Sequence, residues 1–346
     1  MRSHRWIAAA TVALAVAAGI QTAAYASPAA HAARSGHSRP SAAKVTYQLG
    51  VDLDFYWYAT MKVTTYITAD AKYAKGLGAN TVMISFPFYS NRQLPSAGPS
   101  TPSPAILAQA ISAARAQGLQ VGVRPLLDQS NLRGSRVGFL PKNTANWLTA
   151  YAKLLTPYAQ AAQQAGANRF WDGAELTQFA HDKNWALVSG AIKSKFKGGR
   201  YFSANWVTAN DTKVLPGSGG AGVITGADAY PTMPYPLAKL KAEWATRALG
   251  LPKGTVLSEV GIEALANAQY KPYVSSPSTA PLVPAVQVDW FNAACNAVVA
   301  DQLGGIYFWS INVGESLTVK PTSKKPTQFT DGPGATAIKA CFTKLK

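Results

Sequence analysis

Short apolar segments, rich in β-branched and aromatic residues, alternate along the chain with longer Ala-rich segments in which apolar positions recur at helical spacing. The short segments are nearly continuous in apolar residues, which is typical of parallel strands covered on both faces. The predicted strands cover residues 47–58, 80–88, 120–127, 168–174, 200–205, 223–230, 255–260 and 305–312. The predicted helices cover residues 69–78, 104–117, 144–165, 184–196, 237–249, 288–302 and 335–345.

Eight strands, nearly all followed by a helix, within about 300 residues predict an α/β chain folded as a single (β/α)8 TIM barrel. Only residues 207–222, after the fifth strand, lack a clear helix. A doubly wound open sheet is the alternative fold. That fold usually carries a glycine-rich fingerprint after its first strand, and residues 49–52 (Leu-Gly-Val-Asp) lack it.

The first 26 residues have the pattern of a secretory signal peptide. Arg2 and Arg5 precede a charge-free apolar run over residues 6–20, and small residues flank Tyr25 at the expected cleavage site. The run is shorter than the roughly 20 residues that span a bilayer, although a retained anchor is the alternative. Residues 27–45 are predicted to form a flexible lead, and residues 46–346 the barrel. We therefore expect a secreted, extracellular monomer with no membrane association after cleavage.

The two cysteines, Cys295 and Cys341, are predicted to form a disulfide, because an exported protein meets oxidising conditions. This bond would join the last two helices. Two buried free thiols are the alternative.

The chain is strongly basic, with 33 Lys and Arg residues against 16 Asp and Glu residues and a net charge of +17. Such a charge is typical of nucleic-acid binding, but the cations are spread along the chain without a recognisable nucleic-acid fold. We therefore expect no nucleic-acid partner. A basic surface that faces anionic cell walls, or one that is simply solvated, accounts for the charge.

Acidic residues, in contrast, gather where the predicted strands end, which in a barrel is the catalytic face. Nine of the 16 lie there: Asp52, Asp54, Asp128, Asp172, Glu175, Asp228, Glu259, Glu263 and Glu315. Histidine chemistry is poorly supplied, because His181 is the only histidine within the predicted barrel, and no phosphate-binding loop is present. A mechanism that uses carboxylates alone remains, and glycoside hydrolysis is the commonest such mechanism. A carboxylate site for Mg²⁺ or Ca²⁺ is the rival; we expect no metal and no cofactor.

Two strand ends carry a family resemblance. Residues 170–176 read Phe-Trp-Asp-Gly-Ala-Glu-Leu, and residues 256–261 read Val-Leu-Ser-Glu-Val-Gly. This resembles the large clan of retaining (β/α)8 glycoside hydrolases, over roughly residues 46–320, and looks most like its endo-β-1,4-mannanase-like branch. The resemblance implies that Glu175, after the fourth strand, is the acid/base and that Glu259, at the seventh, is the nucleophile. It also implies that Tyr230 hydrogen-bonds the nucleophile and that Trp309 stacks on a sugar.

The sequence departs from the clan at Ala174, where many members have an Asn that binds the sugar 2-hydroxyl. Further substrate-binding candidates lie at or just beyond strand ends: Asp52, Asp54, Trp57, Arg124, Asp128, Asn205 and Trp206. Structural salt bridges and core packing are the alternatives for these residues.

The sequence thus leads to one functional hypothesis with stated alternatives. We expect a glycoside hydrolase that cleaves a β-linked polysaccharide with retention, by double displacement through two carboxylates, with β-1,4-mannan as the first substrate to test. A β-glucanase or xylanase of the same clan is one alternative. A non-catalytic, cell-wall carbohydrate-binding barrel is the other.

Overall fold

The computed structural model describes residues 46–346, except residues 92, 130, 131, 133–135, 181, 207–221, 232–250 and 274–278. The predicted signal peptide, the flexible lead, the helix over 237–249 and His181 lie outside the described residues. Within the described part of the chain, no helix is both long and apolar enough to cross a membrane.

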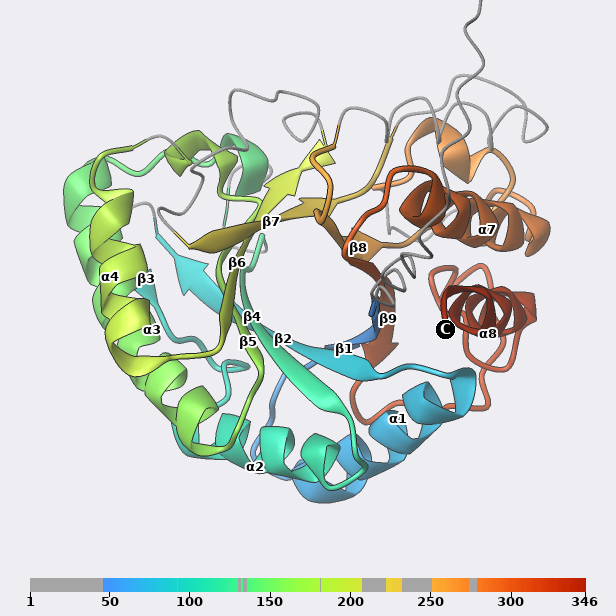
Figure 1. Ribbon diagram of the computed structural model, residues 1–346, viewed down its shortest axis with the longest axis horizontal. Helices are drawn as coiled ribbons and strands as arrows, with labels where there is room; N and C mark the ends of the chain where they lie inside the picture. Colours follow the sequence, from blue (N-terminus) through green and yellow to red (C-terminus); the bar gives the residue numbers. More distant parts are fainter. Residues whose placement is uncertain are drawn as a thin grey trace, which may run out of the picture. The chain divides into compact units, whose positions relative to one another are not determined.

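The strands close into a parallel (β/α)8 barrel, as the sequence predicts (Figure 1). Each barrel strand pairs in parallel with the next, and β9 pairs with β1 to complete the ring. The barrel strands are β1 (Gln48–Asp54), β2 (Thr81–Ser90), β4 (Gln120–Leu127), β5 (Arg169–Ala174), β6 (Gly199–Asn205), β7 (Val223–Asp228), β8 (Val256–Val260) and β9 (Gly305–Asn312). A two-residue strand, β3 (Pro95–Ser96), pairs antiparallel with the end of β2.

Helices surround the barrel (Figure 1). Each helix buries apolar side chains in the core. They are α1 (Val63–Leu77), α2 (Pro104–Arg115), α3 (Thr144–Gln164), α4 (Trp185–Lys195), α7 (Ala285–Ala300) and α8 (Pro333–Leu345). Short 3₁₀ turns follow β4, β5 and β8: η1 (Arg136–Gly138), η2 (Thr177–Phe179) and η4 (Ala268–Tyr270).

Two element boundaries differ clearly from the sequence prediction. Helix α1 begins at Val63, six residues before the predicted start, because buried Val63 and Ile67 anchor a first turn whose β-branched residues have weak helix propensity. Strand β1 ends at Asp54 rather than at residue 58. The aromatic residues 55–58 that extended the prediction instead begin the loop after β1, where Phe55 is buried and Tyr56 is exposed.

Large side chains fill the barrel interior because the neighbouring strands carry glycine beside them. A Cβ atom added to Gly50 would collide with the ring of Tyr307, and one added to Gly122 would lie 2.7 Å from the ring of Trp171. Trp171 and Tyr307 meet edge to face with their ring centroids 5.7 Å apart, and both side chains are buried. The interior is therefore a packed core rather than a pore, and the functional groups lie above it.

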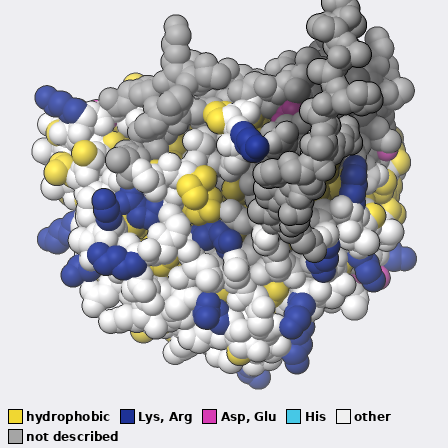
Figure 2. Space-filling view, viewed as in Figure 1, with side chains coloured by type: hydrophobic (Ala, Val, Ile, Leu, Met, Phe, Trp, Pro, Cys, Tyr) yellow, Lys and Arg dark blue, Asp and Glu magenta, His cyan; other side chains and the backbone are white. Residues whose placement is uncertain are grey.

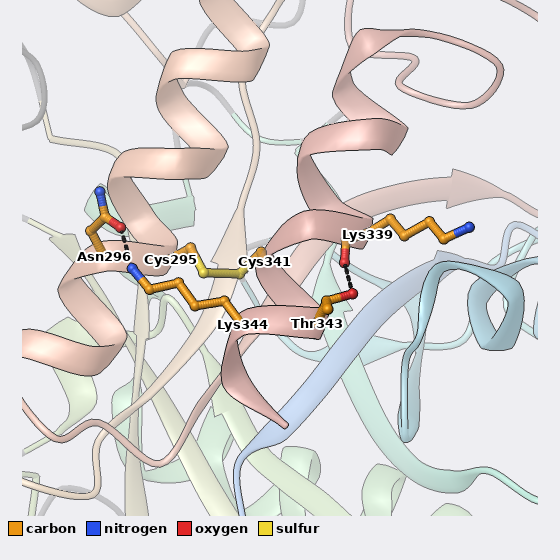
Figure 3. The surroundings of a disulfide bond; sticks show 6 residues. All are labelled: Cys295, Asn296, Lys339, Cys341, Thr343 and Lys344. Atoms are coloured by element: carbon orange, nitrogen blue, oxygen red, sulfur yellow. Dashed lines mark hydrogen bonds between the residues drawn. A yellow bond between two sulfur atoms is a disulfide. The ribbon is translucent and has the colours of Figure 1, made fainter.

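The predicted disulfide between Cys295 and Cys341 is confirmed and joins α7 to α8 (Figure 3). The two Cα atoms lie 5.7 Å apart, and both side chains are buried. Close to the bond, Lys344 donates a hydrogen bond to Asn296 across the same two helices. Figure 2 shows that Lys and Arg side chains are spread over one face of the molecule, on which few acidic side chains are visible.

Candidate active site

Glu259 lies on β8, opposite Asp228 of β7 in the strand register. The register shifts beside both residues, and such irregularities re-aim side chains at the rim of a barrel. Arg124 donates to Oε2 of Glu259 at 2.5 Å, and the Tyr230 hydroxyl donates to Oε1 at 2.6 Å. The side chain of Glu259 is 12% exposed. Its carboxylate is therefore held by one cation and one neutral donor, with part of its surface open.

Arg124, on β4, is fully buried and is the centre of the acidic layer. Besides Glu259, its guanidinium contacts Asp228 at 2.5 Å and Asp52 at 3.6 Å. Burial lowers the pKa of Arg124, but the charges of Asp228, Glu259 and Asp52 outweigh burial and raise it. Burial raises the pKa values of Asp52 and Asp228, and Arg124 opposes that rise. Arg124 and Asp52 expose no surface, so neither side chain offers a face to a sugar; Arg124 instead contacts the carboxylate of Glu259, and Asp52 contacts Arg124.

Glu175 directly follows β5 and has a φ of 54°, in the left-handed region that residues with a side chain rarely adopt. Its backbone N–H donates to the carbonyl of Ser203 on β6 at 2.9 Å, which holds this conformation in place. Asn205 donates to Oε1 at 2.8 Å, and Nε of Arg136 lies 3.2 Å from Oε2. Such strained backbone often marks a functional residue, and both oxygens of this carboxylate face donors.

The two glutamates converge on the same neighbours. The charges of Glu259 and Glu175 both contribute to raising the pKa of Asp228, after burial, which is the largest cause. The pKa of Tyr230 is raised by burial first, then by Glu259 and more weakly by Glu175. Glu175 and Glu259 therefore act on one small region at the carboxyl ends of β5 to β8, and the hydrogen bond that the resemblance implies between Tyr230 and Glu259 is present.

A second polar group lies at the carboxyl ends of β1 and β4. Asp54 has an enclosed Oδ1 atom without a hydrogen-bond partner among the described residues. Burial and then the charge of Glu259 raise the pKa of Asp54 to about 7. Asp128 accepts a 2.6 Å hydrogen bond from the hydroxyl of Tyr56, whose side chain is 43% exposed. This group offers oxygen atoms near Glu259 and suits recognition of sugar hydroxyls.

The predicted aromatic residues differ in how much of each side chain is exposed. Trp309 and Trp57 are half-buried, and Arg124 lies 5.8 Å from the ring centroid of Trp309. Trp309 therefore belongs to the same site as Glu259. Trp206 is 4% exposed and packs into the apolar core, so it presents no open face for stacking.

Not every acid at a strand end belongs to the site. Asp172 on β5 pairs with Arg200 at 3.1 Å, and Arg200 also donates to Ser189 of α4, so this carboxylate lies between the sheet and its helices. Glu315, after β9, pairs with Lys325 at 2.9 Å. These acids stabilise the barrel and its loops.

Sequence reasoning missed Arg136 and Tyr56 as members of the site. Both lie in loops, where no periodic pattern fixes the direction of a side chain. Asp228 was counted among the acids at strand ends but not assigned a role, and its pairing with Arg124 depends on strands 104 residues apart. Among the residues that the structure describes, no three or more His, Cys, Asp or Glu side chains are arranged to hold a metal ion.

A (β/α)8 barrel with one glutamate after its fourth strand and another on its seventh defines a class of protein, the barrel glycoside hydrolases. The family model of Glycoside Hydrolase Family 113 matches residues 69–329, and the chain belongs to this family. The protein is accordingly a glycoside hydrolase, and its family points to a polysaccharide or oligosaccharide substrate.

Solved structures agree on the fold. A structure of a GH113 β-1,4-mannanase in complex aligns with a TM-score of 0.72 at 13% identity, covering 86% of this chain and 99% of the other. A GH113 β-mannanase from Alicyclobacillus acidocaldarius aligns with a TM-score of 0.70 at 16% identity, covering 87% and 98%. A triple mutant of an endo-β-1,4-glucanase from Xanthomonas axonopodis pv. citri aligns less well, with a TM-score of 0.53 at 14% identity, covering 86% and 100%. No curated protein sequence matches the chain significantly.

Proposed function

We propose that this protein is a retaining β-mannanase, with Glu175 as acid/base and Glu259 as nucleophile. One observation carries the proposal: in a chain of Family 113, both glutamates lie at strand ends around Asp228 and Tyr230, each held by its own arginine. The choice of β-mannan is supported by the solved Family 113 structures, which are described as β-mannanases.

In the first half of the proposed reaction, an oxygen of Glu259 attacks the anomeric carbon and forms a glycosyl ester. The glycosidic C–O bond breaks, and Glu175 gives its proton to the departing oxygen. Arg124 and Tyr230 hold the nucleophile from two sides, which fixes the direction of attack and stabilises the carboxylate. In this geometry the positioning groups are already in place before the substrate arrives.

In the second half, a water molecule attacks the anomeric carbon and gives a proton to Glu175. The ester bond breaks, and its electron pair returns to Glu259, so the enzyme is regenerated and the product keeps the β configuration. Asn205 donates to Glu175 from the end of β6. It therefore supplies an amide beside the acid/base although Ala174 occupies the position where many clan members have Asn.

The proposal is tested by incubating the protein with β-mannan, xylan, cellulose and laminarin and counting new reducing ends. We expect release from mannan, with the β anomer formed first in NMR spectra. Glu175→Gln and Glu259→Gln should each abolish release, whereas the matched control Glu315→Gln, which removes an acid outside the site, should keep it. Release from xylan or cellulose alone would assign a different substrate, and binding of a glycan without any release would refute catalysis.

We also propose that the protein is exported, on the basis of the basic residues, apolar run and small-residue site within residues 1–26. Expression in a secreting host followed by N-terminal sequencing of the medium fraction tests this. A mature chain that begins near residue 27 supports export, and an intact chain retained in cells contradicts it.

A further inference from the structure

The glycine two residues after Glu259 has close neighbours. Gly261 directly follows β8 and is buried. A Cβ atom built on it would lie 3.1 Å from the hydroxyl oxygen of Tyr230, and 3.3 and 3.4 Å from Cβ and Cδ1 of Trp309. Because non-bonded carbon atoms in a protein interior lie about 3.5–4.0 Å apart, a methyl group does not fit here unless a neighbour moves. The hydroxyl that donates to Glu259 and the side chain of Trp309 thus both border the space that this glycine leaves.

The φ angle does not account for the glycine. The φ of Gly261 lies outside the left-handed region, whereas that of Gly254, in the turn before β8, is 84°. Glycine is needed at a position like Gly254 because other residues rarely adopt such an angle. At position 261 the requirement comes instead from the two neighbouring side chains.

The two neighbours differ in how far they can yield. The nearest atom of Trp309 is its Cβ, which is fixed to the backbone of β9, and β9 is paired with β8 on one side and with β1 on the other. The nearest atom of Tyr230 is its hydroxyl oxygen, at the far end of a half-buried side chain. The backbone before Tyr230 is held in place, because the N–H of Ala229 donates to the carbonyl of Glu259 at 2.7 Å. A methyl group at position 261 would therefore displace the hydroxyl rather than a strand.

The group that would yield is the one that holds the nucleophile candidate. The Tyr230 hydroxyl donates to Oε1 of Glu259 at 2.6 Å, while Arg124 holds Oε2. Lengthening the 3.1 Å contact to an ordinary distance of about 3.5 Å moves the hydroxyl by about 0.4 Å. Such a shift weakens the hydrogen bond on one oxygen and leaves the other oxygen held, so the carboxylate turns away from its present direction.

We infer that Gly261 is a positioning residue of the proposed reaction, whose missing side chain lets Tyr230 hold Glu259 in the direction of attack. The inference rests on the proposed function, because it takes Glu259 as the nucleophile. Gly261 acts through Tyr230 and needs no contact with the sugar. Since a misplacement of about 1 Å costs about 100-fold in rate, a shift of about 0.4 Å predicts a loss of about three- to tenfold.

The test is a double-mutant cycle that measures kcat and KM for a manno-oligosaccharide. It compares the wild type, Gly261→Ala, Tyr230→Phe and the double variant. We expect Gly261→Ala to lower kcat about three- to tenfold, with KM within about twofold of the wild type because β9 keeps Trp309 in place. In the Tyr230→Phe background the hydroxyl that the methyl group meets is absent, so the same substitution should change kcat by less than about twofold.

Controls separate this effect from a general disturbance of the barrel. Gly190→Ala on α4 adds the same methyl group where no atom lies within 4 Å, and it should leave kcat and KM unchanged. Denaturant unfolding of the four proteins of the cycle shows whether each is folded. Should Gly261→Ala unfold, the double variant should still fold and have the activity of Tyr230→Phe.

Three results would overturn the inference. They are a wild-type kcat in folded Gly261→Ala, an equal loss of kcat with and without the Tyr230 hydroxyl, and a double variant that does not fold. An equal loss would mean that the methyl group acts through Trp309 or the backbone. A wild-type protein that acts on no glycoside would instead overturn the proposed function.

Discussion

Replacing Arg124 by Met should destabilise the protein strongly and in a pH-dependent way. The substitution removes the cation shared by Asp52, Asp228 and Glu259 while keeping an aliphatic side chain in the barrel. Removing one partner of a buried ion pair costs about 3–5 kcal/mol, because a buried charge is left uncompensated. Two of the three carboxylates here are fully buried, so we expect the free energy of unfolding to fall by about 4–5 kcal/mol at pH 8.

The pH dependence has a definite sign. In the folded protein, burial already raises the pKa values of Asp52 and Asp228, and the loss of Arg124 removes the main influence that opposes this rise. A carboxyl whose folded-state pKa lies above its unfolded value binds more protons when folded. Stability is then greatest at low pH and falls as the pH rises towards the folded-state pKa. The variant should therefore lose less stability at pH 5 than at pH 8.

Denaturant unfolding of the wild type and Arg124→Met at pH 5, 6.5 and 8 measures both effects. Adding Asp228→Asn to the variant should restore part of the stability at pH 8, because it removes one of the uncompensated charges. Arg115→Met, on the exposed end of α2, should change stability by no more than about 0.5 kcal/mol. A loss below about 1 kcal/mol at pH 8, or a pH slope equal to that of the wild type, would refute this account of the buried network.

Three further outcomes follow from particular contacts. Replacing Cys295 and Cys341 together by Ala should lower the free energy of unfolding by about 2–4 kcal/mol, because the disulfide closes a loop over a separation of 46 residues. Thermal unfolding should show this loss under oxidising conditions, and an equal midpoint in both proteins would contradict it. Tyr230→Phe should lower kcat/KM for mannan about 10- to 100-fold, because Glu259 loses its 2.6 Å hydrogen bond. The free energy of unfolding should change by only about 1 kcal/mol. Unchanged kinetics would remove Tyr230 from the mechanism. Burial raises the pKa of Asp70 on α1 to about 7. The protonated Asp70 carboxyl therefore contributes fully to the free energy of unfolding below about pH 4, and this contribution is lost as the pH rises to 7. Asp70→Asn should therefore match the wild type near pH 4 and be more stable by about 1–3 kcal/mol at pH 7.5, and equal stability at both pH values would argue against a buried, protonated carboxyl.

The local pattern of the chain was sufficient to predict the barrel. Residues 120–127 and 305–312 form β4 and β9 with the predicted bounds, because each is a mostly apolar run just after a glycine, as is typical of a strand covered on both faces. The start of α1 could not be predicted in this way. Its first turn carries β-branched residues and no side-chain cap, and it is helical because Val63 packs into the core.

The candidate site likewise contains residues that the sequence predicted and residues whose orientation only the folded structure decides. Glu175, Glu259 and Tyr230 were predicted from the family resemblance of the strand ends that carry them, and the structure places Tyr230 in a hydrogen bond with Glu259. Whether a polar residue at a strand end faces the site or the helices depends on register shifts. The shift between Trp171 and Gly173 lies beside Asp172, which pairs with Arg200 at the helices, and the shift beside Asp228 accompanies its pairing with Arg124.

The sequence by itself determined the number and order of the barrel strands, the joining of the last two helices by a disulfide, and the two glutamates at the carboxyl ends of strands. These features depend on short-range periodicity and on residue chemistry, which a linear chain displays. Only the tertiary structure decided which arginine serves which carboxylate. Arg124 and Glu259 are 135 residues apart in the chain, and Arg136 and Glu175 meet through a loop. Such pairings arise when the barrel closes, because burial then forces each charge to find a partner that no local pattern specifies.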